Sequence, residues 1–298
     1  MTGIAKAVPV AFPAKLAQRN MTFSQAIETT EAVVQRRTVR LAVEYDGTSF
    51  CGLQFQPELR SVAGVLEKAL SRVFEEPIKL AAAGRTDAGV HASGQVVSFT
   101  TTRSTFPFER LTRALNSALP GDLSVREAAV VEAEFSARFS AIERTYVYAI
   151  LNRSEPSALL ARYAAHVWAP IDVDRFADAS RHFIGTHDFR SFCATLPENG
   201  ITVRTIHAFT VQQRCGLIRI QVTGDGFLHK MVRTIVGTLI QCGTGRRDPE
   251  SIPAVIAARD RKSAGLTAVP HGLYLAGVVY RGGYDSYAEP PIFQSGEP

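Results

Sequence analysis

The stretch TVRLAVEY, residues 38–45, decides the beginning of the fold. Every second residue from Val39 to Tyr45 is apolar, which predicts a strand with one buried face. The loop DGTSFCG follows, and residues 61–74 then carry apolar side chains at helical spacing behind Ser61, a predicted N-cap. The sequence therefore opens its folded part with a strand and an amphipathic helix.

The rest of the chain repeats this alternation. In the first half we expect strands at 78–83, 95–100 and 123–131 and a helix at 107–118. In the second half we expect strands at 144–151, 201–211, 216–223 and 273–280, with helices at 172–183, 227–241 and 250–259. Each half then has the order βαββαβ, the ferredoxin-like plan, in which helices cover one face of an antiparallel sheet. The predicted fold is α+β, with two ferredoxin-like (RRM-like) domains in tandem.

The predicted domain organisation has four parts: a loose N-terminal extension at 1–35, domains at 36–143 and 144–282, and a surface-draped tail at 283–298. Two sheets side by side, each with one face free of helices, would form a long concave surface suited to RNA. The alternative is that the two sheets bury these faces against each other.

Composition limits the class of protein. Of 298 residues, 46% are hydrophobic and 20% are charged, which excludes a disordered or low-complexity chain. The net charge is +5, and 27 arginines but only 6 lysines carry the positive charge. Guanidinium groups suit phosphates and base edges, although a GC-rich genome would also explain the arginines.

Two further features concern compartment and cofactors. No apolar run reaches the roughly 18 residues of a membrane span, so we expect no membrane association. The four cysteines lack metal-ligand spacing, which indicates reduced thiols in the cytoplasm and no bound metal.

The loop AAAGRTDAGVHASGQVVSF, residues 81–99, contains the first candidate site. If the chain stays extended, Arg85 and Asp87 leave the same face and pair, and the guanidinium keeps the carboxylate ionised as a nucleophile or base. Gly89 and Gly94 allow tight turns. The alternative is an ordinary Asp turn, with His91 as a structural hydrogen-bonding residue.

The second candidate site lies in the segment TGDGFLHKMVRTIVG, residues 223–237. On a helical wheel, His229, Lys230, Arg233 and Gly237 share the arc opposite the apolar stripe. This cationic arc predicts a phosphate-binding helix edge or, alternatively, a solvated helix face.

The third candidate site is the strand RTYVYAI, residues 144–150, where Tyr146 and Tyr148 share one face. An aromatic ring on a sheet beside a basic groove can stack on a displaced base. The alternative is a pair of half-buried packing tyrosines.

Taken together, six segments resemble the tRNA pseudouridine synthase A family: EYDGTSFCGLQFQ (44–56), GRTDAGVHA (84–92), RTYVY (144–148), GTHDFRSFC (185–193), GDGFLHKMVRTIVG (224–237) and GLYLAGVVY (272–280). The resemblance spans roughly residues 38–282 in family order. It implies a homodimer with two ferredoxin-like domains per chain and no metal or organic cofactor. It also implies isomerisation of uridine to pseudouridine at positions 38, 39 and 40 in the anticodon arm of tRNA.

The resemblance assigns roles residue by residue. Asp87 matches the family's catalytic aspartate, and Arg85 matches the arginine that pairs with it and helps to displace the target base. Tyr146 matches the tyrosine that stacks on the flipped uracil and is proposed to relay a proton. Leu273 matches an apolar residue packed against the site. His91, His229, Lys230 and Arg233 remain our candidate RNA contacts.

The expected chemistry needs little machinery. Uracil must leave C1′, rotate and rejoin through C5, so one ionised acid and a base-stacking wall suffice. The acid would add to C6, attack C1′ or remove the C2′ proton, and the sequence does not choose among these routes. Two other classes stay open: a non-catalytic RNA-binding protein and an RNA glycosidase, although a glycosidase normally needs a second carboxylate.

Overall fold

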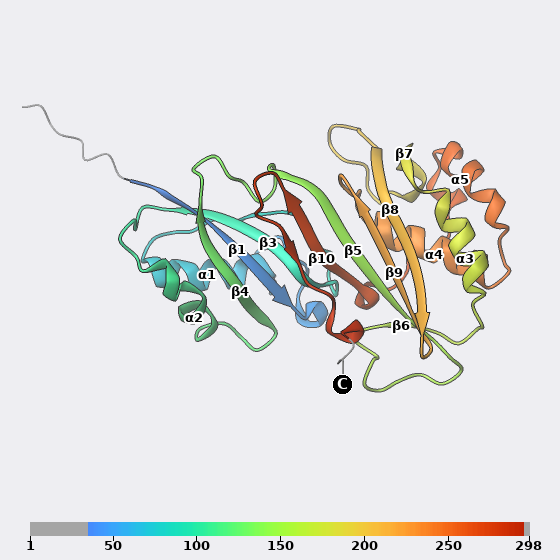
Figure 1. Ribbon diagram of the computed structural model, residues 1–298, viewed down its shortest axis with the longest axis horizontal. Coiled ribbons are helices and arrows are strands. Elements are labelled where there is room, and N and C mark those ends of the chain that lie inside the picture. The colour runs from blue at the N-terminus through green and yellow to red at the C-terminus, as the bar shows by residue number, and fades with distance from the viewer. Residues whose placement is uncertain (1–34, 295–298) are drawn as a thin grey trace, which may run out of the picture. The chain divides into compact units, whose positions relative to one another are not determined.

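The computed structural model describes residues 35–294, so the predicted extension at 1–35 lies almost entirely outside the described residues. The described residues form an α+β fold (Figure 1). The first half contains β1 (Arg37–Tyr45), α1 (Val62–Phe74), β2 (Ala81–Ala82), β3 (His91–Thr101), α2 (Leu111–Asn116) and β4 (Leu123–Val131). The second half contains β5 (Ala141–Asn152), β6 (Ala165–Val167), α3 (Val173–Arg181), β7 (Gly185–Asp188), β8 (Val203–Arg214), β9 (Leu217–Gly224), α4 (Met231–Gly243), α5 (Ile252–Ala258), β10 (Leu273–Tyr280) and β11 (Ser286–Tyr287).

These strands belong to a single 11-stranded sheet, with the main order β4-β1-β3-β10-β5-β9-β8-β7. Strands β3 and β10 join the two halves as a parallel pair, through Tyr274 opposite His91 and Leu275 opposite Ala92. The two sheets that we expected to lie side by side are therefore hydrogen-bonded into one. This junction brings the loop between β2 and β3 next to elements of the second half.

Local sequence explains the elements that the patterns predicted. In β1, Val39, Leu41 and Val43 are buried in the same apolar cluster as Leu66 and Leu70 of α1. The Ser61 side chain accepts a hydrogen bond from the backbone N–H of Gly64 at 3.2 Å, as expected of an N-cap. Alternation in the strand and a capped apolar stripe in the helix thus pack α1 onto one face of the sheet.

Several elements differ from their predicted bounds. Helix α4 begins at Met231 rather than at 227, because Lys230 adopts a left-handed backbone conformation with φ 59°. The strand expected at 78–83 is shortened to β2, Ala81–Ala82, followed by one further backbone hydrogen bond from Ala83 to β3. Gly94 does not turn the chain but lies within β3, where an added Cβ would sit 2.1 Å from the Ala276 carbonyl oxygen of β10. Gly94 thus permits the close approach of two strands.

The sheet face opposite α1 is not free at its centre. Residues 285–293, which we call the C-terminal strap, include β11, which pairs with β10, and then contact Ser93 of β3 and Arg219 of β9 (Figure 1). The Arg40 guanidinium, only 2% exposed, donates to the Asp285 carbonyl oxygen at 3.0 Å, and Arg219 pairs with Glu289 at 2.6 Å. The expectation of a continuous open face for RNA is therefore wrong. The described part of the predicted tail is joined to the sheet through β11 and through these side-chain contacts.

Two observations bear on the expectations about compartment. Among residues 35–294, no helix is both long and apolar enough to cross a membrane. The four cysteines all lie in this part of the chain and are free thiols.

Candidate active site

The loop that carries Asp87 is fixed to the strands beneath it. The Thr86 hydroxyl lies 2.8 Å from the Tyr45 hydroxyl, and the Gln95 amide donates to the Gly84 carbonyl oxygen at 2.8 Å. The Leu53 backbone N–H also donates to the Thr86 carbonyl oxygen at 3.0 Å. The neighbours of Asp87 are thereby held in place, so its carboxylate has a defined position.

Asp87 pairs with a residue from the second half of the chain. Its Oδ2 accepts a hydrogen bond from Arg233 Nη1 at 2.8 Å, and its Oδ1 lies 3.6 Å from His229 Nε2. The Arg233 side chain is 11% exposed, and its Nε also donates to the Ala268 carbonyl oxygen at 2.8 Å. A partly shielded charge pair of this kind fixes the orientation of the carboxylate.

The predicted pairing of Arg85 with Asp87 is wrong in this geometry. Arg85 is exposed and forms no ion pair with Asp87, while Thr86 between them turns inward against Tyr45. Arg233 from the second half of the chain, not Arg85, is the arginine that pairs with Asp87. Arg85 instead lies at the surface beside the carboxylate, free to meet a ligand.

Tyr146 lies close to the same loop. An added Cβ at Gly84 would sit 3.3 Å from the Tyr146 hydroxyl, and the ring packs edge-on against Phe227 with centroids 5.1 Å apart. Burial raises the pKa of Tyr146 above its ordinary value, and the neighbouring Tyr45 and Asp87 raise it further. The phenol therefore stays protonated, which suits a hydrogen-bond donor and a ring wall.

The apolar residues around Tyr146 come from β10. Leu275 is the direct cross-strand partner of Tyr146, whereas Leu273, the residue singled out from the sequence, is the partner of Tyr148. Both leucines are buried. Leu275, rather than Leu273, is therefore the leucine of β10 that lies directly opposite Tyr146.

The cationic arc of the second segment does not form a solvated helix face. Arg233 is turned to Asp87, and an added Cβ at Gly237 would lie 1.7 Å from the Leu266 carbonyl oxygen. The chain's own segment around Leu266 therefore covers this arc. His229 and Lys230 lie just before α4, where His229 is exposed and Lys230 is half-buried.

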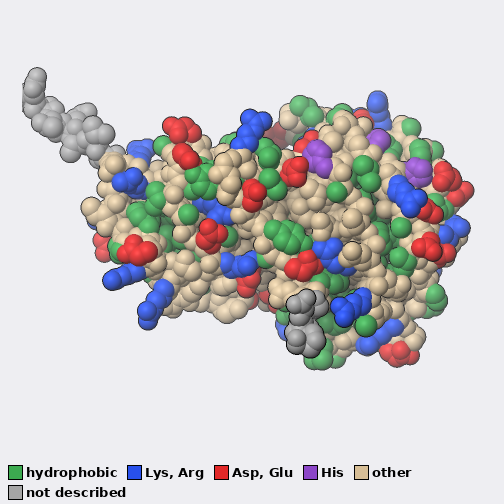
Figure 2. All heavy atoms as spheres, viewed as in Figure 1, with side chains coloured by type: hydrophobic (Ala, Val, Ile, Leu, Met, Phe, Trp, Pro, Cys, Tyr) green, Lys and Arg blue, Asp and Glu red, His purple; other side chains and the backbone are tan. Residues whose placement is uncertain are grey.

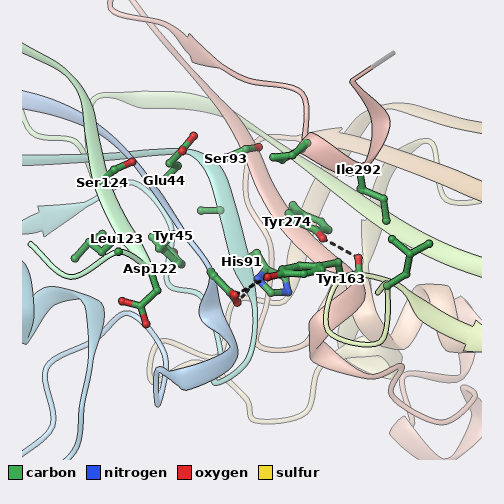
Figure 3. Close-up of a pocket in the computed structure, with 15 residues that line it drawn as sticks. Glu44, Tyr45, His91, Ser93, Asp122, Leu123, Ser124, Tyr163, Tyr274 and Ile292 are labelled. Carbon is green, nitrogen blue, oxygen red and sulfur yellow. Dashed lines mark hydrogen bonds and ion pairs between the residues drawn. The ribbon is translucent and has the colours of Figure 1, made fainter. Parts of the chain in front are cut away.

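His91 occupies a different place. It is 2% exposed and stacks on Tyr274, and it lines a cavity of about 400 Å³ together with Tyr163 (Figure 3). Its Nδ1 accepts a hydrogen bond from the Gly47 backbone N–H at 3.0 Å, and its Nε2 lies 2.9 Å from the Arg162 carbonyl oxygen. Both ring nitrogens are thus used within the chain. His91 holds three segments together and offers no free edge to RNA.

We expect His91 to make stability depend on pH. Burial lowers its pKa below the ordinary 6.5, although Asp46 opposes this. The unfolded chain therefore binds the proton more readily, so stability is complete above pH 6.5 and decreases as the pH falls toward the folded-state pKa. We therefore expect the free energy of unfolding, measured by chemical denaturation between pH 5 and 8, to change less with pH in His91→Asn than in the parent protein. The exposed His166→Asn is the control, and equal slopes in the parent and His91→Asn would contradict this interpretation.

The sequence did not single out several residues that shape the site. Tyr45 and Gln95 anchor the Asp87 loop, and Phe227 and Leu275 flank Tyr146. Tyr45 belongs to the buried face of a strand and resembles any core residue there. Only the pairing of distant strands reveals these contacts.

Comparison with known proteins identifies the family. A family model described as tRNA pseudouridine synthase matches residues 41–140 and 179–281, which include Asp87 and Arg233. Three relatives called tRNA pseudouridine synthase A are similar over most of the chain. The one from Caldicellulosiruptor bescii is 42% identical over 246 residues, covering 82% of this chain and 100% of the relative. The relative from Halalkalibacterium halodurans is 44% identical (80% and 90% covered), and the one from Bacillus subtilis is 41% identical (81% and 98% covered). The chain belongs to the tRNA pseudouridine synthase family.

Proposed function

We propose that the chain isomerises uridine to pseudouridine at positions 38, 39 and 40 in the anticodon arm of tRNA, with Asp87 as the catalytic carboxylate. One observation carries the assignment of Asp87: its loop is anchored on both sides, and Arg233 from the other half holds its carboxylate at 2.8 Å. A fixed ionised carboxylate beside an aromatic ring is what the removal and rotation of uracil require.

Arg233 and Tyr146 have separate roles in the proposed reaction. Arg233 stabilises the negative charge of Asp87 before the reaction. When the carboxylate bonds to C6 or C1′, or takes the C2′ proton, that charge passes to the uracil, and it returns to Asp87 when the bond breaks or the proton is given back. The ring of Tyr146 forms a wall for the displaced base, and its protonated hydroxyl can donate to a uracil oxygen. Uracil then rejoins through C5, the C5 proton leaves, and N1 ends protonated.

We propose that tRNA approaches from the helix-bearing side of the sheet. Asp87 and Tyr146 lie on the side of α4, and Arg85 and His229 are exposed beside the carboxylate. The opposite side carries the strap, and Figure 2 shows acidic and basic side chains interspersed over that face. Arg85, His229 and Lys230 are therefore the candidate phosphate contacts.

We also propose that residues 36–143 and 144–282 are two ferredoxin-like domains. The strand order β4-β1-β3-β2 of the first half has the same plan as β10-β5-β9-β8 of the second. Each is the order expected of βαββαβ units. By the same family resemblance, we propose a cytoplasmic homodimer that needs neither a metal nor an organic cofactor.

The test of this function is product mapping. Unmodified tRNA treated with the purified protein should acquire carbodiimide-dependent stops of reverse transcription at positions 38–40, with no change in RNA mass. Free uracil would instead indicate a glycosidase, and tRNA that is bound but unaltered would indicate a binding protein. Stops only outside the anticodon arm would overturn the proposed target.

A second test separates two roles of Tyr146. Tyr146→Phe keeps the ring face, worth about 1–3 kcal/mol per stacked base, and removes only the hydroxyl. We expect normal tRNA affinity with a turnover reduced about tenfold or more, because a hydrogen-bond donor is lost beside the reacting base. Tyr146→Leu should lose both affinity and turnover.

Single-turnover rates and melting temperatures, measured together, check these expectations. If Tyr146→Phe has the parental rate and stability, the hydroxyl takes no part in the reaction. If Tyr146→Leu is merely less stable, with an unchanged rate per folded molecule, the ring is a core residue and not a wall for the base.

A further inference from the structure

The Arg144 side chain lies at the meeting point of three segments around the site. Arg144 belongs to β5, two residues before Tyr146 and on the same face. Its Nε donates to the Ala83 carbonyl oxygen at 3.0 Å, and its Nη1 donates to the Asp225 carbonyl oxygen at 2.8 Å. Its Nη1 and Nη2 also donate to the carbonyl oxygens of Ala141 and Arg138, at 3.2 and 3.0 Å.

Two of these acceptors belong to the segments that bring the reacting groups together. Ala83 directly precedes the GRTDAG segment, four residues before Asp87. Asp225 lies in the loop between β9 and α4, which leads through Phe227 and His229 to Arg233. One guanidinium therefore links the loop of the carboxylate with the loop of its partners.

The chemistry of this contact is specific to arginine. Among the described residues Arg144 forms no salt bridge, and all four of its hydrogen bonds go to backbone carbonyl oxygens. A planar fork with five N–H groups can reach carbonyls in several directions at once, whereas a lysine ammonium is a single point with three donors. A contact that needed only a buried positive charge would not need this shape.

We propose that Arg144 is a positioning residue for the isomerisation, which sets the Asp87 loop at the correct distance from the segment carrying His229 and Arg233. The inference rests on the proposed role of Asp87. Arg144 touches no substrate atom; it acts by holding Ala83 and Asp225. Because a displacement of about 1 Å in a reacting group can cost on the order of 100-fold in rate, small shifts of the loop are sufficient.

The test compares Arg144→Lys with Arg126→Lys. Arg126 is a matched control because its guanidinium also donates to a backbone carbonyl oxygen, that of Ser93 at 2.9 Å, away from Asp87. We expect Arg144→Lys to lower the single-turnover rate about 100-fold while the tRNA dissociation constant changes less than about threefold. Arg126→Lys should keep the parental rate.

Chemical rescue distinguishes positioning from a general effect on folding. In Arg144→Ala, millimolar methylguanidinium should restore part of the rate, and methylammonium should not. An Arg144→Lys rate within about threefold of the parent would overturn the proposal. The proposal would also be overturned if the rate fell only in proportion to the amount of folded protein and methylguanidinium did not restore it. Failure of the proposed function is recognised separately, since an active Asp87→Asn would remove the role of Asp87 whatever Arg144 does.

Discussion

Asp87→Asn should reduce pseudouridine formation by at least about a thousandfold while leaving the binding of tRNA intact. The carboxamide has nearly the same shape as the carboxylate but is neither a nucleophile nor a base. The Arg233 guanidinium at 2.8 Å can still contact the amide oxygen, so the loop keeps its position. Single-turnover conversion of unmodified tRNA, with the dissociation constant from filter binding, measures both quantities.

A matched control removes a carboxylate that also binds arginine. Asp122 pairs with Arg60 at 2.7 Å, outside the site, and Asp122→Asn should turn over at the parental rate. Turnover by Asp87→Asn within about tenfold of the parent would show that another group performs the chemistry. A parallel loss of tRNA affinity would mean that the charge serves binding rather than reaction.

The sequence patterns predicted the elements whose formation depends on residues close together in the chain. The alternation in β1 and the capped stripe of α1 follow from side chains that must bury one face of each element. They required no knowledge of the neighbours, and the observed elements lie close to the expected ranges. Where strand length depended on a partner, as for β2 and β3, the predicted bounds were wrong.

The charge pair of the site could not be predicted in this way. Asp87 and Arg233 are 146 residues apart and meet only because β3 pairs with β10. The spacing rule chose Arg85 because that residue is close to Asp87 in the sequence, but the carboxylate pairs with Arg233 from the second half of the chain. A helical wheel placed Arg233 on a solvated arc because it contains no information about the segment around Leu266 that covers this arc.

Removing the positive charge at position 233 should lower turnover nearly as much as removing the Asp87 carboxylate. Arg233→Met removes the only ion-pair partner within 3 Å of Asp87 among the described residues, and the side chain it replaces is 11% exposed. We expect turnover to fall about 100- to 1000-fold, comparable to the loss of one charge-stabilising donor in other enzymes. Arg233→Lys should recover part of this loss, because a point charge replaces the fork that also donates to the Ala268 carbonyl oxygen.

The control for Arg233→Met is Arg259→Met, which breaks a 3.0 Å pair with Asp188 whose carboxylate is about as exposed as Asp87. Rates should be measured below the melting temperature of each variant, because removing a partly buried charge also destabilises the fold. Equal, small losses in both variants would make the Arg233 pair an ordinary surface contact. A large loss confined to Arg233→Met, with tRNA still bound, would mean that the second half of the chain supplies the charge that keeps Asp87 reactive.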